Sequence, residues 1–220
     1  MPVIKGLHRG ARFPLLLLAV FAMTWIALAV APRYRQDWLL ENGLVLAAVP
    51  WLAYSYRRLR LSNAAYLALF VFLTCHEIGA HYTYSEVPYE QWLSHIHVSL
   101  AWLGRNSYDR LVHFLYGLLV TPAAAELLVT VAPPRGIWRW ILPVSFIMSH
   151  SLLYELIEWA AALTFGGDLG IAYLGTQGDP WDAQRDMLAA TLGSMVAMTA
   201  LLIAERGNPA AQDTSHASDV

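Results

Sequence analysis

Acidic residues and histidines recur at helical spacing within four apolar stretches of the sequence. Asp182 and Asp186 are four residues apart, so they share one face of a helix. Asp109 and His113 have the same spacing. The other members of this set are His76, Glu77, His81, Glu155 and Glu158. Imidazoles and carboxylates on the helices of one bundle can bind a divalent metal, and an Asp–His pair can act as a general base without one.

The acids around Asp182 stand at the start of a long apolar helix. Gly178-Asp179-Pro180 predicts a turn, after which the helix runs from Asp182 to Ala204. An exposed acid near a helix N-terminus is stabilised by about 0.3–1 kcal/mol, which is enough to explain Asp179 and Asp182. Asp186 lies a full turn further along, where it faces the bundle or lipid, so the helix dipole explains it less well.

The composition predicts a membrane protein. Hydrophobic residues make up 57% of the 220 residues and charged residues only 14%, against about 25% charged residues in soluble proteins. The mean hydropathy is +0.44. A net charge of −2 and scattered basic residues give no sign of a nucleic-acid surface. The single cysteine, Cys75, excludes an intrachain disulfide and a cysteine-based zinc framework.

The apolar runs are long enough to cross the bilayer core of about 30 Å, and they predict an all-α polytopic bundle of about six helices. The predicted spans cover residues 14–31, 39–56, 62–84, 109–131, 137–165 and 182–204. We expect residues 1–206 to form a single integral-membrane domain. Residues 207–220 are small and polar, which predicts a disordered tail.

The first apolar run has an alternative interpretation as a cleaved signal peptide. A short basic head precedes it, and Ala27-Leu28-Ala29 and Ala29-Val30-Ala31 resemble signal-peptidase sites. The run of 18 residues is long for the core of a signal peptide, and Pro32 directly follows the later site. The length therefore favours a retained helix.

The basic residues predict the orientation, because cytoplasmic loops carry an excess of Lys and Arg. With both termini cytoplasmic, the inner segments hold nine basic residues: Lys5, Arg9, Arg12, Arg57, Arg58, Arg60, Arg135, Arg139 and Arg206. The outer segments then hold five: Arg33, Arg35, Arg105, Arg110 and Arg185. Nine against five favours this orientation, with the acids and histidines near the extracytoplasmic face.

In this topology the polar pairs of the third to sixth spans lie at one depth. An ionisable residue inside a bilayer costs about 2.5–3.5 kcal/mol on insertion scales, so such placement by chance is improbable. Only Glu126, toward the inner end of the fourth span, stands apart. Each of these four spans thus has one polar stripe, formed by its acids and histidines. We therefore expect the four polar stripes to converge on one site.

Some of these residues also have a purely structural explanation. Glu77 and His81 are four apart and can bond each other near the interface. Asp109 can cap the helix that it opens. His113 has no such explanation, and neither does the Glu155–Glu158 pair, which apolar residues flank on both sides.

Long motifs in the second half of the chain resemble a known family. They are Asn106-x-Tyr108-Asp109-Arg110-x-x-His113-Phe114, Tyr154-Glu155-x-x-Glu158-Trp159 and Gly175-Thr176-Gln177-Gly178-Asp179-x-Trp181-Asp182-x-Gln184-x-Asp186. These motifs resemble the YjdF family of bacterial inner-membrane proteins, over residues from about 65 to 204. The resemblance implies a multi-pass fold in the inner membrane, and it carries no known activity.

A fainter likeness links the chain to VanZ-like membrane proteins, which are associated with glycopeptide-antibiotic resistance. Their pattern of acidic residues and a His-Phe pair is matched in order by Asp109-Arg110-x-x-His113-Phe114, Glu155, Asp182 and Asp186. Ala190 stands where that pattern has Asn, and Glu158 where Gln is usual. The likeness implies common ancestry and leaves shared chemistry open.

Three functions from different classes fit these features. The first is an enzyme, a hydrolase or group transferase, that acts on a lipid or lipid-linked head group at the extracytoplasmic face. The second is a structural or resistance accessory protein whose polar cluster holds helices together, although interhelical polar contacts average only about 0.6 kcal/mol. The third is a proton-coupled transporter. The position of the acids and histidines at one side of the membrane argues against it, because a transport pathway needs polar groups across the whole membrane.

For the enzyme we assign roles to the polar residues. His113 is the expected general base, because its unperturbed pKa of about 6.5 suits that task, with Asp109 or Asp186 orienting it. The expected substrate-binding residues are Arg110, Arg185 and Gln177, since arginine can bind a phosphate. The candidate metal ligands are His76, Glu77, His81, Glu155, Glu158 and Asp182. The metal, the substrate and the oligomeric state are left open, and the expected partner is the lipid bilayer.

Overall fold

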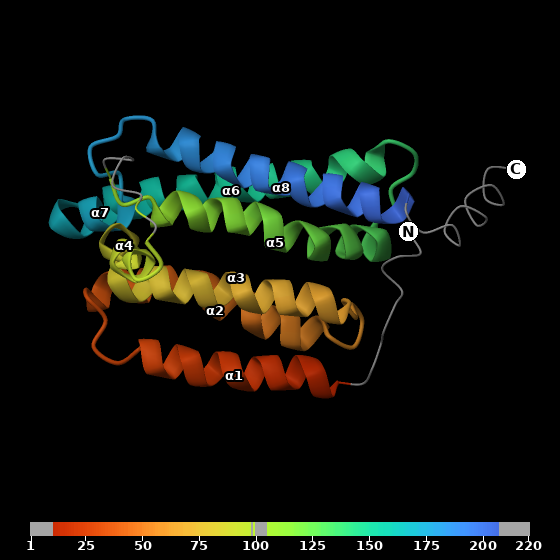
Figure 1. The fold of residues 1–220 in the computed structure, drawn as a ribbon, viewed down its shortest axis with the longest axis horizontal. Helices are drawn as coiled ribbons and strands as arrows, with labels where there is room; N and C mark the ends of the chain where they lie inside the picture. Colours follow the sequence, from red (N-terminus) through yellow and green to blue (C-terminus); the bar gives the residue numbers. More distant parts are fainter. Residues whose placement is uncertain (1–10, 98, 100–104, 207–220) are drawn as a thin grey trace, which may run out of the picture.

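The long helices run side by side along the longest axis of the molecule (Figure 1). The computed structural model describes residues 11–97, 99 and 105–206. The long helices among them are α1 (Arg12–Leu28), α2 (Arg35–Ser55), α3 (Asn63–Tyr82), α5 (Tyr108–Val131), α6 (Trp138–Phe165) and α8 (Asp182–Arg206). These bounds lie within four residues of the six predicted spans, and the all-α fold class is confirmed.

Three short elements gather at one end of the bundle, on the left of Figure 1. They are the 3-10 helix η2 (Tyr84–Glu86), α4 (Tyr89–Ser94) and α7 (Gly167–Leu174). The loop of residues 175–181 lies at this same end, which we call the α7 end. The segments that contain α4 and α7 connect long helices and include glycine, proline and polar residues. The sequence therefore has no long apolar run that predicts these two helices.

Four of the described helices, α3, α5, α6 and α8, are long and apolar enough to cross a membrane. Helix α1 is apolar and has 17 residues, slightly fewer than a typical span. Helix α2 begins at Arg35 rather than near residue 39, and the charged residues of its first two turns lower its hydropathy. The membrane crossing of α1 and α2 stays a prediction, and the predicted tail of residues 207–220 lies outside the described residues.

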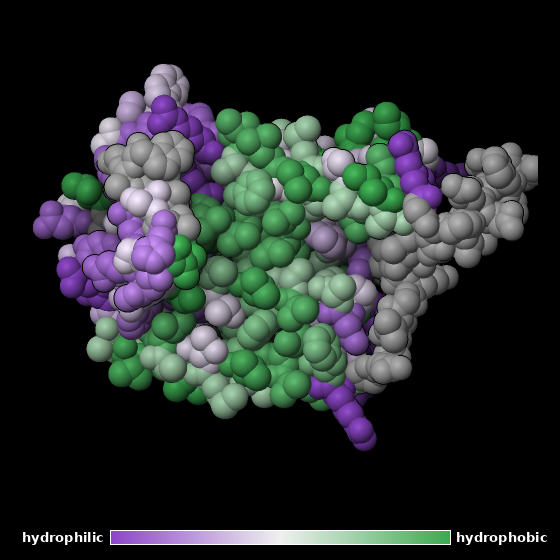
Figure 2. All heavy atoms as spheres, in the orientation of Figure 1, coloured by the Kyte–Doolittle hydropathy of each residue, from purple (hydrophilic) through white to green (hydrophobic). Residues whose placement is uncertain are grey.

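Apolar side chains cover the middle of the visible face, and hydrophilic residues are concentrated at the α7 end (Figure 2). Leu152, Leu156 and Leu163 are exposed along α6, for example. Such apolar patches on the outside of a bundle are typical of a surface that contacts lipid. The distribution therefore fits a protein whose long axis runs across the bilayer.

Helices α5 and α8 touch through their backbones at two glycines. A Cβ atom on Gly117 of α5 would lie 1.9 Å from the carbonyl oxygen of Ala190, and one on Gly193 of α8 would lie 2.1 Å from that of Phe114. A hydrogen bond of 2.7 Å from Thr121 to Ser194 joins the same helices deeper in the bundle. Small residues permit this close approach in membrane bundles, so α5 and α8 form a fixed pair.

Helix α1 is attached to the bundle chiefly at the α7 end. The indole nitrogen of Trp25 donates a hydrogen bond of 2.5 Å to Oδ1 of Asn42 in α2. The ring of His81 in α3 donates from Nδ1 to the carbonyl oxygen of Leu28, over 2.7 Å. These bonds lie near the C-terminal end of α1, and its N-terminal half forms no hydrogen bond to another helix among the described residues.

Candidate functional site

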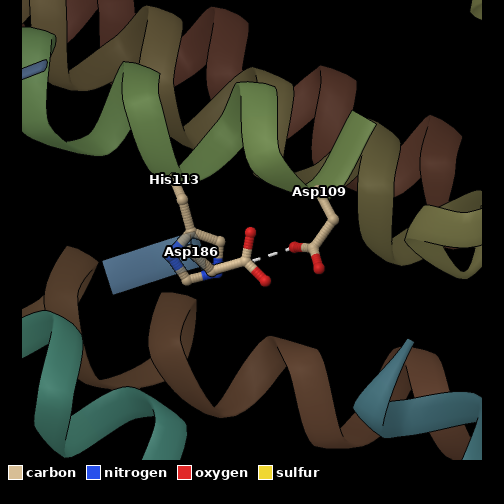
Figure 3. A group of neighbouring side chains, drawn as sticks. All are labelled: Asp109, His113 and Asp186. Atoms are coloured by element: carbon tan, nitrogen blue, oxygen red, sulfur yellow. Dashed lines mark ion pairs between the residues drawn. The ribbon is translucent and has the colours of Figure 1, made fainter. Parts of the chain in front are cut away.

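Asp109, His113 and Asp186 point toward one another between α5 and α8 (Figure 3). One potential ligand atom from each residue lies within 4.8 Å of the other two. Nε2 of His113 is 3.6 Å from Oδ1 of Asp109, and both side chains come from successive turns of α5. Asp186 is 2% exposed, so the predicted lipid-facing alternative for this residue is wrong. We call these three residues the α5–α8 triad.

Helix α6 adds two acids to the triad. Oε1 of Glu155 lies 3.7 Å from Nε2 of His113. Glu158, one turn further along α6, is buried within electrostatic range of Glu155 and Asp186. Oε1 of Glu155 and Oδ1 of Asp186 are both buried and have no hydrogen-bond partner among the described residues. These two oxygens are therefore free to bind a ligand or an ion.

A network of three arginines and two aspartates closes the α7 end next to the triad. Asp182 accepts hydrogen bonds from Arg105, over 2.5 Å, and from Arg110, over 3.1 Å. Asp179 pairs with Arg110 and, over 2.5 Å, with Arg185. The side chains of Asp179 and Asp182 are thus neutralised by arginines, while Nε of Arg110 stays 3.9 Å from Asp186.

The loop acid Asp179 is held in its charged form by this network. Removal from water raises the pKa of Asp179, but a hydrogen bond from the Trp181 N–H, one from Arg110 and the charge of Arg185 outweigh that effect. The net result is a pKa below the ordinary value of 3.8. Asp179 therefore links the loop to the start of both α5 and α8.

Negative charge exceeds positive charge around the triad. The acids of this region are Asp109, Glu155, Glu158, Asp179, Asp182 and Asp186, and the cations are Arg105, Arg110 and Arg185. The three arginines pair mainly with Asp179 and Asp182. An uncompensated buried carboxylate is costly, so the remaining acids need bound protons or a cation.

A second group of buried acids lies between α2 and α3. It consists of Asp37, Glu41 and Glu77, each at most 3% exposed. The hydroxyl of Tyr154 in α6 donates a hydrogen bond of 2.8 Å to Oε2 of Glu41. The ring of Tyr154 lies edge-on to the His113 ring, with centroids 6.0 Å apart. Tyr154 therefore connects the two acidic groups.

The ring nitrogens of His76 are both engaged away from the triad. Nε2 of His76 lies 3.2 Å from the backbone carbonyl oxygen of Glu41, which can only accept a hydrogen bond. Nε2 must therefore carry the proton, and Nδ1 accepts from the Tyr84 hydroxyl over 2.5 Å. By contrast, Nε2 of His113 forms no hydrogen bond with a described residue, and carboxylate oxygens of Asp109 and Glu155 lie 3.6 and 3.7 Å from it.

A cavity of about 180 Å³ adjoins the triad. Asp109 and His113 form one part of its wall, and His76, Tyr84, Tyr154 and His150 contribute further polar atoms. Most of the remaining wall is apolar and comes from Leu44, Phe72, Val112, Tyr116, Leu153 and Ile157. Leu153 and Ile157 are also exposed on the outside of α6, so the cavity lies close to the lipid-facing surface.

The structure brings together only part of the predicted site. Asp109, His113, Asp186 and Glu155 converge, and Glu158 lies next to Glu155. Asp182 and Arg185 belong to the arginine–aspartate network, in which Arg110 is the member nearest the triad. Gln177 bonds the backbone of Asn106 in both directions, over 3.0 and 2.8 Å, and so fixes the loop.

Three predicted metal ligands lie outside this convergence. Glu77 faces Trp38 and Asn42 of α2. His81 bonds α1, and His76 lies in the cavity wall with both nitrogens engaged. The candidate site therefore comprises residues of α5, α6 and α8, and, contrary to our expectation, the polar stripe of α3 is not part of it.

Sequence reasoning missed Tyr154, Arg105 and the acids of α2. Asp37 and Glu41 are four residues apart, the same signal that singled out Asp182 and Asp186. The predicted second span starts at residue 39, so Asp37 falls in the preceding loop and Glu41 in the first turn of the span. Tyr154 directly precedes Glu155 and had no signal of its own beyond its place in that motif.

Comparisons with known proteins agree with this architecture. The chain is 36% identical over 176 residues to the inner membrane protein YjdF of Escherichia coli (strain K12). The aligned region covers 76% of this chain and 78% of that relative. No solved structure matches the chain. The model of the family described as predicted membrane protein DUF2238 matches residues 13–207. The chain therefore belongs to the DUF2238 family of membrane proteins.

Proposed function

We propose that this chain is a membrane-embedded, metal-dependent hydrolase or group transferase that acts on the polar head group of a lipid or lipid-linked substrate. The α5–α8 triad binds the metal, and the cavity beside it receives the part of the substrate next to the reacting bond. The observation that carries the proposal is the convergence of three potential ligand atoms within 4.8 Å.

The charge and bonding of the site support a bound cation. Within the described part of the chain, Oδ1 of Asp186 and Oε1 of Glu155 are buried without hydrogen-bond partners. A divalent ion between these carboxylates and Nε2 of His113 would offset their charge and satisfy both oxygens. One imidazole with two or three carboxylates is a ligand set that suits Zn²⁺ or Mn²⁺. When bound, such an ion polarises a carbonyl or phosphoryl oxygen or lowers the pKa of a water.

The surroundings of the triad suggest an amphiphilic substrate. One part of the cavity wall is polar, and most of the rest is apolar and close to the lipid-facing surface of α6. A lipid tail fits the apolar part and a head group the polar part. Arg110 lies at the junction of the triad and the arginine network, where its guanidinium can contact an anionic head group.

The basic residues support an extracytoplasmic position for the site. Of the described cations, Arg33, Arg35, Arg105, Arg110 and Arg185 belong to segments of the α7 end. The other described cations belong to segments of the opposite end: Arg12, Arg57, Arg58, Arg60, Arg135, Arg139 and Arg206. The excess of positive charge at the opposite end favours its placement in the cytoplasm.

A transport function has less support. Below the triad, α5 and α8 are in backbone contact at Gly117 and Gly193. This contact leaves no space for a pathway between these two helices toward the opposite end. Glu126, the buried acid near that end, accepts two hydrogen bonds of 2.6 Å from Ser62 at the start of α3, which gives it a structural role.

Metal content tests the proposed centre. The purified protein, loaded with Zn²⁺ or Mn²⁺ and passed through a desalting column, should retain about one ion per chain. Asp186→Asn and His113→Ala should lose that ion. The matched controls are His150→Ala, a histidine of the same cavity wall outside the triad, and Asp168→Asn, an exposed acid of α7. Retention of the ion by both triad variants would reject the centre.

Lipid profiles test the reaction. Extracts of a strain without this protein should accumulate a lipid or lipid-linked precursor that the parent strain consumes. The wild-type chain should restore the parental profile, whereas Asp186→Asn, expressed at the same level, should not. Restoration by Asp186→Asn, or a deletion profile identical to the parent's, would favour the structural role instead.

A further inference from the structure

A second cavity lies at the opposite end of the molecule from the triad. It has a volume of about 420 Å³ and is enclosed by the N-terminal half of α1, the C-terminal half of α2 and the first half of α3. Its walls are mainly apolar, with Leu18 and Phe21 from α1, Leu52 from α2, and Leu69 and Leu73 from α3. Its volume falls within the range of about 300–1,000 Å³ that is usual for ligand pockets.

The way in which α1 is attached accounts for this cavity. Trp25 and the carbonyl of Leu28 bond α2 and α3 near the C-terminal end of α1. The N-terminal half of α1 has no such bond among the described residues, and the side chains that it turns toward α2 and α3 are mainly apolar. Leu15 and Leu18 are partly turned to the outside, so a lipid chain can reach the cavity from the bilayer.

The polar groups of this cavity are cationic or aromatic. Arg57 and Arg60, in the loop after α2, line its end, together with Tyr56 and Tyr66, whose rings lie 6.0 Å apart. None of the described lining residues is acidic. Neither Arg57 nor Arg60 forms an ion pair with any described residue within 4.0 Å, although both are exposed. Two guanidinium groups without an ion-pair partner among the described residues thus stand at the rim of a mainly apolar cavity.

We infer that this cavity is a binding site for an anionic phospholipid. One acyl chain lies between α1, α2 and α3, and the phosphate contacts Arg57 and Arg60. Basic pockets between membrane helices bind anionic head groups in this way, and arginine can form two parallel hydrogen bonds with a phosphate. Because the site lies at the other end of the bundle, the inference is independent of the proposed function of the triad.

Native mass spectrometry of protein from nanodiscs of defined composition tests this site. The wild-type chain should retain one phosphatidylglycerol at least fivefold better than phosphatidylcholine. The double variant Arg57→Gln/Arg60→Gln should lose this preference. Arg58→Gln is the matched control, because Arg58 lies in the same loop and does not line the cavity. Leu52→Trp, which fills the cavity, should reduce retention of every lipid.

Other occupants predict different results. If a second copy of the chain fills the cavity, the spectra should contain a dimer that Leu52→Trp removes, and no preference for phosphatidylglycerol. If the preceding residues of the same chain fill it, deletion of residues 2–10 should create lipid retention that the full chain lacks. Either result, or equal retention of the two lipids by the wild-type chain, overturns the inference.

Discussion

The hydroxyl of Tyr154 donates a hydrogen bond of 2.8 Å to Oε2 of Glu41, and this bond joins α6 to α2 in the interior of the bundle. Glu41 is 3% exposed and belongs to the acidic group of α2 and α3. The Tyr154 ring also packs edge-on against His113 of the triad. One side chain thus positions both an acid of the first half of the bundle and the histidine of the second.

Tyr154→Phe should keep the ring contact with His113 and remove the bond to Glu41. A buried acceptor without its donor costs about 1–3 kcal/mol in soluble proteins, and interhelical polar contacts in membranes average about 0.6 kcal/mol. We expect a loss of about 1 kcal/mol in unfolding free energy in detergent. Tyr54→Phe, at a tyrosine of α2 that is 80% exposed, should change nothing. Equal effects of the two variants would contradict this role.

Gly117→Ala should separate α5 from α8. The new Cβ atom would meet the backbone of Ala190 at 1.9 Å, and backbone cannot move aside as a flexible side chain can. Overpacking of this kind typically costs about 1–3 kcal/mol. The matched control is Gly43→Ala in α2, where no atom lies within 4 Å of the added Cβ, so better helix propensity should stabilise it slightly. Thermal unfolding of both variants measures the difference, and a neutral Gly117→Ala would disprove the close contact.

Metal binding at the triad should stabilise the folded chain. An ion that binds only the folded state raises the unfolding free energy by about 2.7 kcal/mol at a concentration 100 times its Kd. We expect the melting temperature of the wild-type protein to rise with added Mn²⁺ or Zn²⁺ and to fall back after a chelator is added. Asp186→Asn should melt at the same temperature with and without the ion. A similar rise in that variant would place the ion elsewhere.

The loop of residues 175–181 should loosen in acid. The folded-state pKa of Asp179 is lowered, so its contribution is fully present above the ordinary value of 3.8 and is lost as the pH falls through the lower folded value. Hydrogen exchange of the loop amides, relative to that of α8, should therefore accelerate only below about pH 4. Asp179→Asn should exchange faster already at neutral pH, and its loop should lack this acid transition.

Both ends of the chain should lie in the cytoplasm. Reporter fusions after Arg60 and after Arg206 should give cytoplasmic signals, and a fusion after Asn106 should give an extracytoplasmic one. The excess of basic residues at the end opposite to α7 is the physical reason. A reversed pattern of signals would mean that the triad lies on the cytoplasmic side. A mature protein that lacks its N-terminal segment would show that the chain is cleaved after the first apolar run.

The helices could be predicted from the sequence because hydropathy and helix length follow from local composition. The predicted fourth and fifth spans start within one residue of α5 and α6. The pairing of Asp109 with His113 was equally local, since four residues make one helical turn. Trp38 shows the limit of local composition, which does not reveal that its side chain is buried with its ring 5.9 Å from that of Trp25.

Convergence across helices was harder to predict, because depth in the membrane says nothing about the direction in which a helix face points. His76 and His81 lie in the C-terminal half of α3, yet their rings bond neighbouring groups of the first half of the bundle. Asp182 pairs with two arginines instead of standing free as a ligand, and one of them, Arg105, lies 77 residues before it in the chain. Rotation of each helix about its axis is set by packing, which a single sequence does not display.

Backbone contact between α5 and α8 also limits the size of the ion that the triad can accept. Gly117 lies one turn from His113 along α5, and Gly193 lies two turns from Asp186 along α8. The two helices therefore cannot move apart near the ligands without breaking this contact. Zn²⁺ takes ligands at about 2.0–2.2 Å and Ca²⁺ at 2.3–2.6 Å, with a coordination number of six to eight. We expect the spacing fixed by two glycines to favour the smaller ion and exclude Ca²⁺.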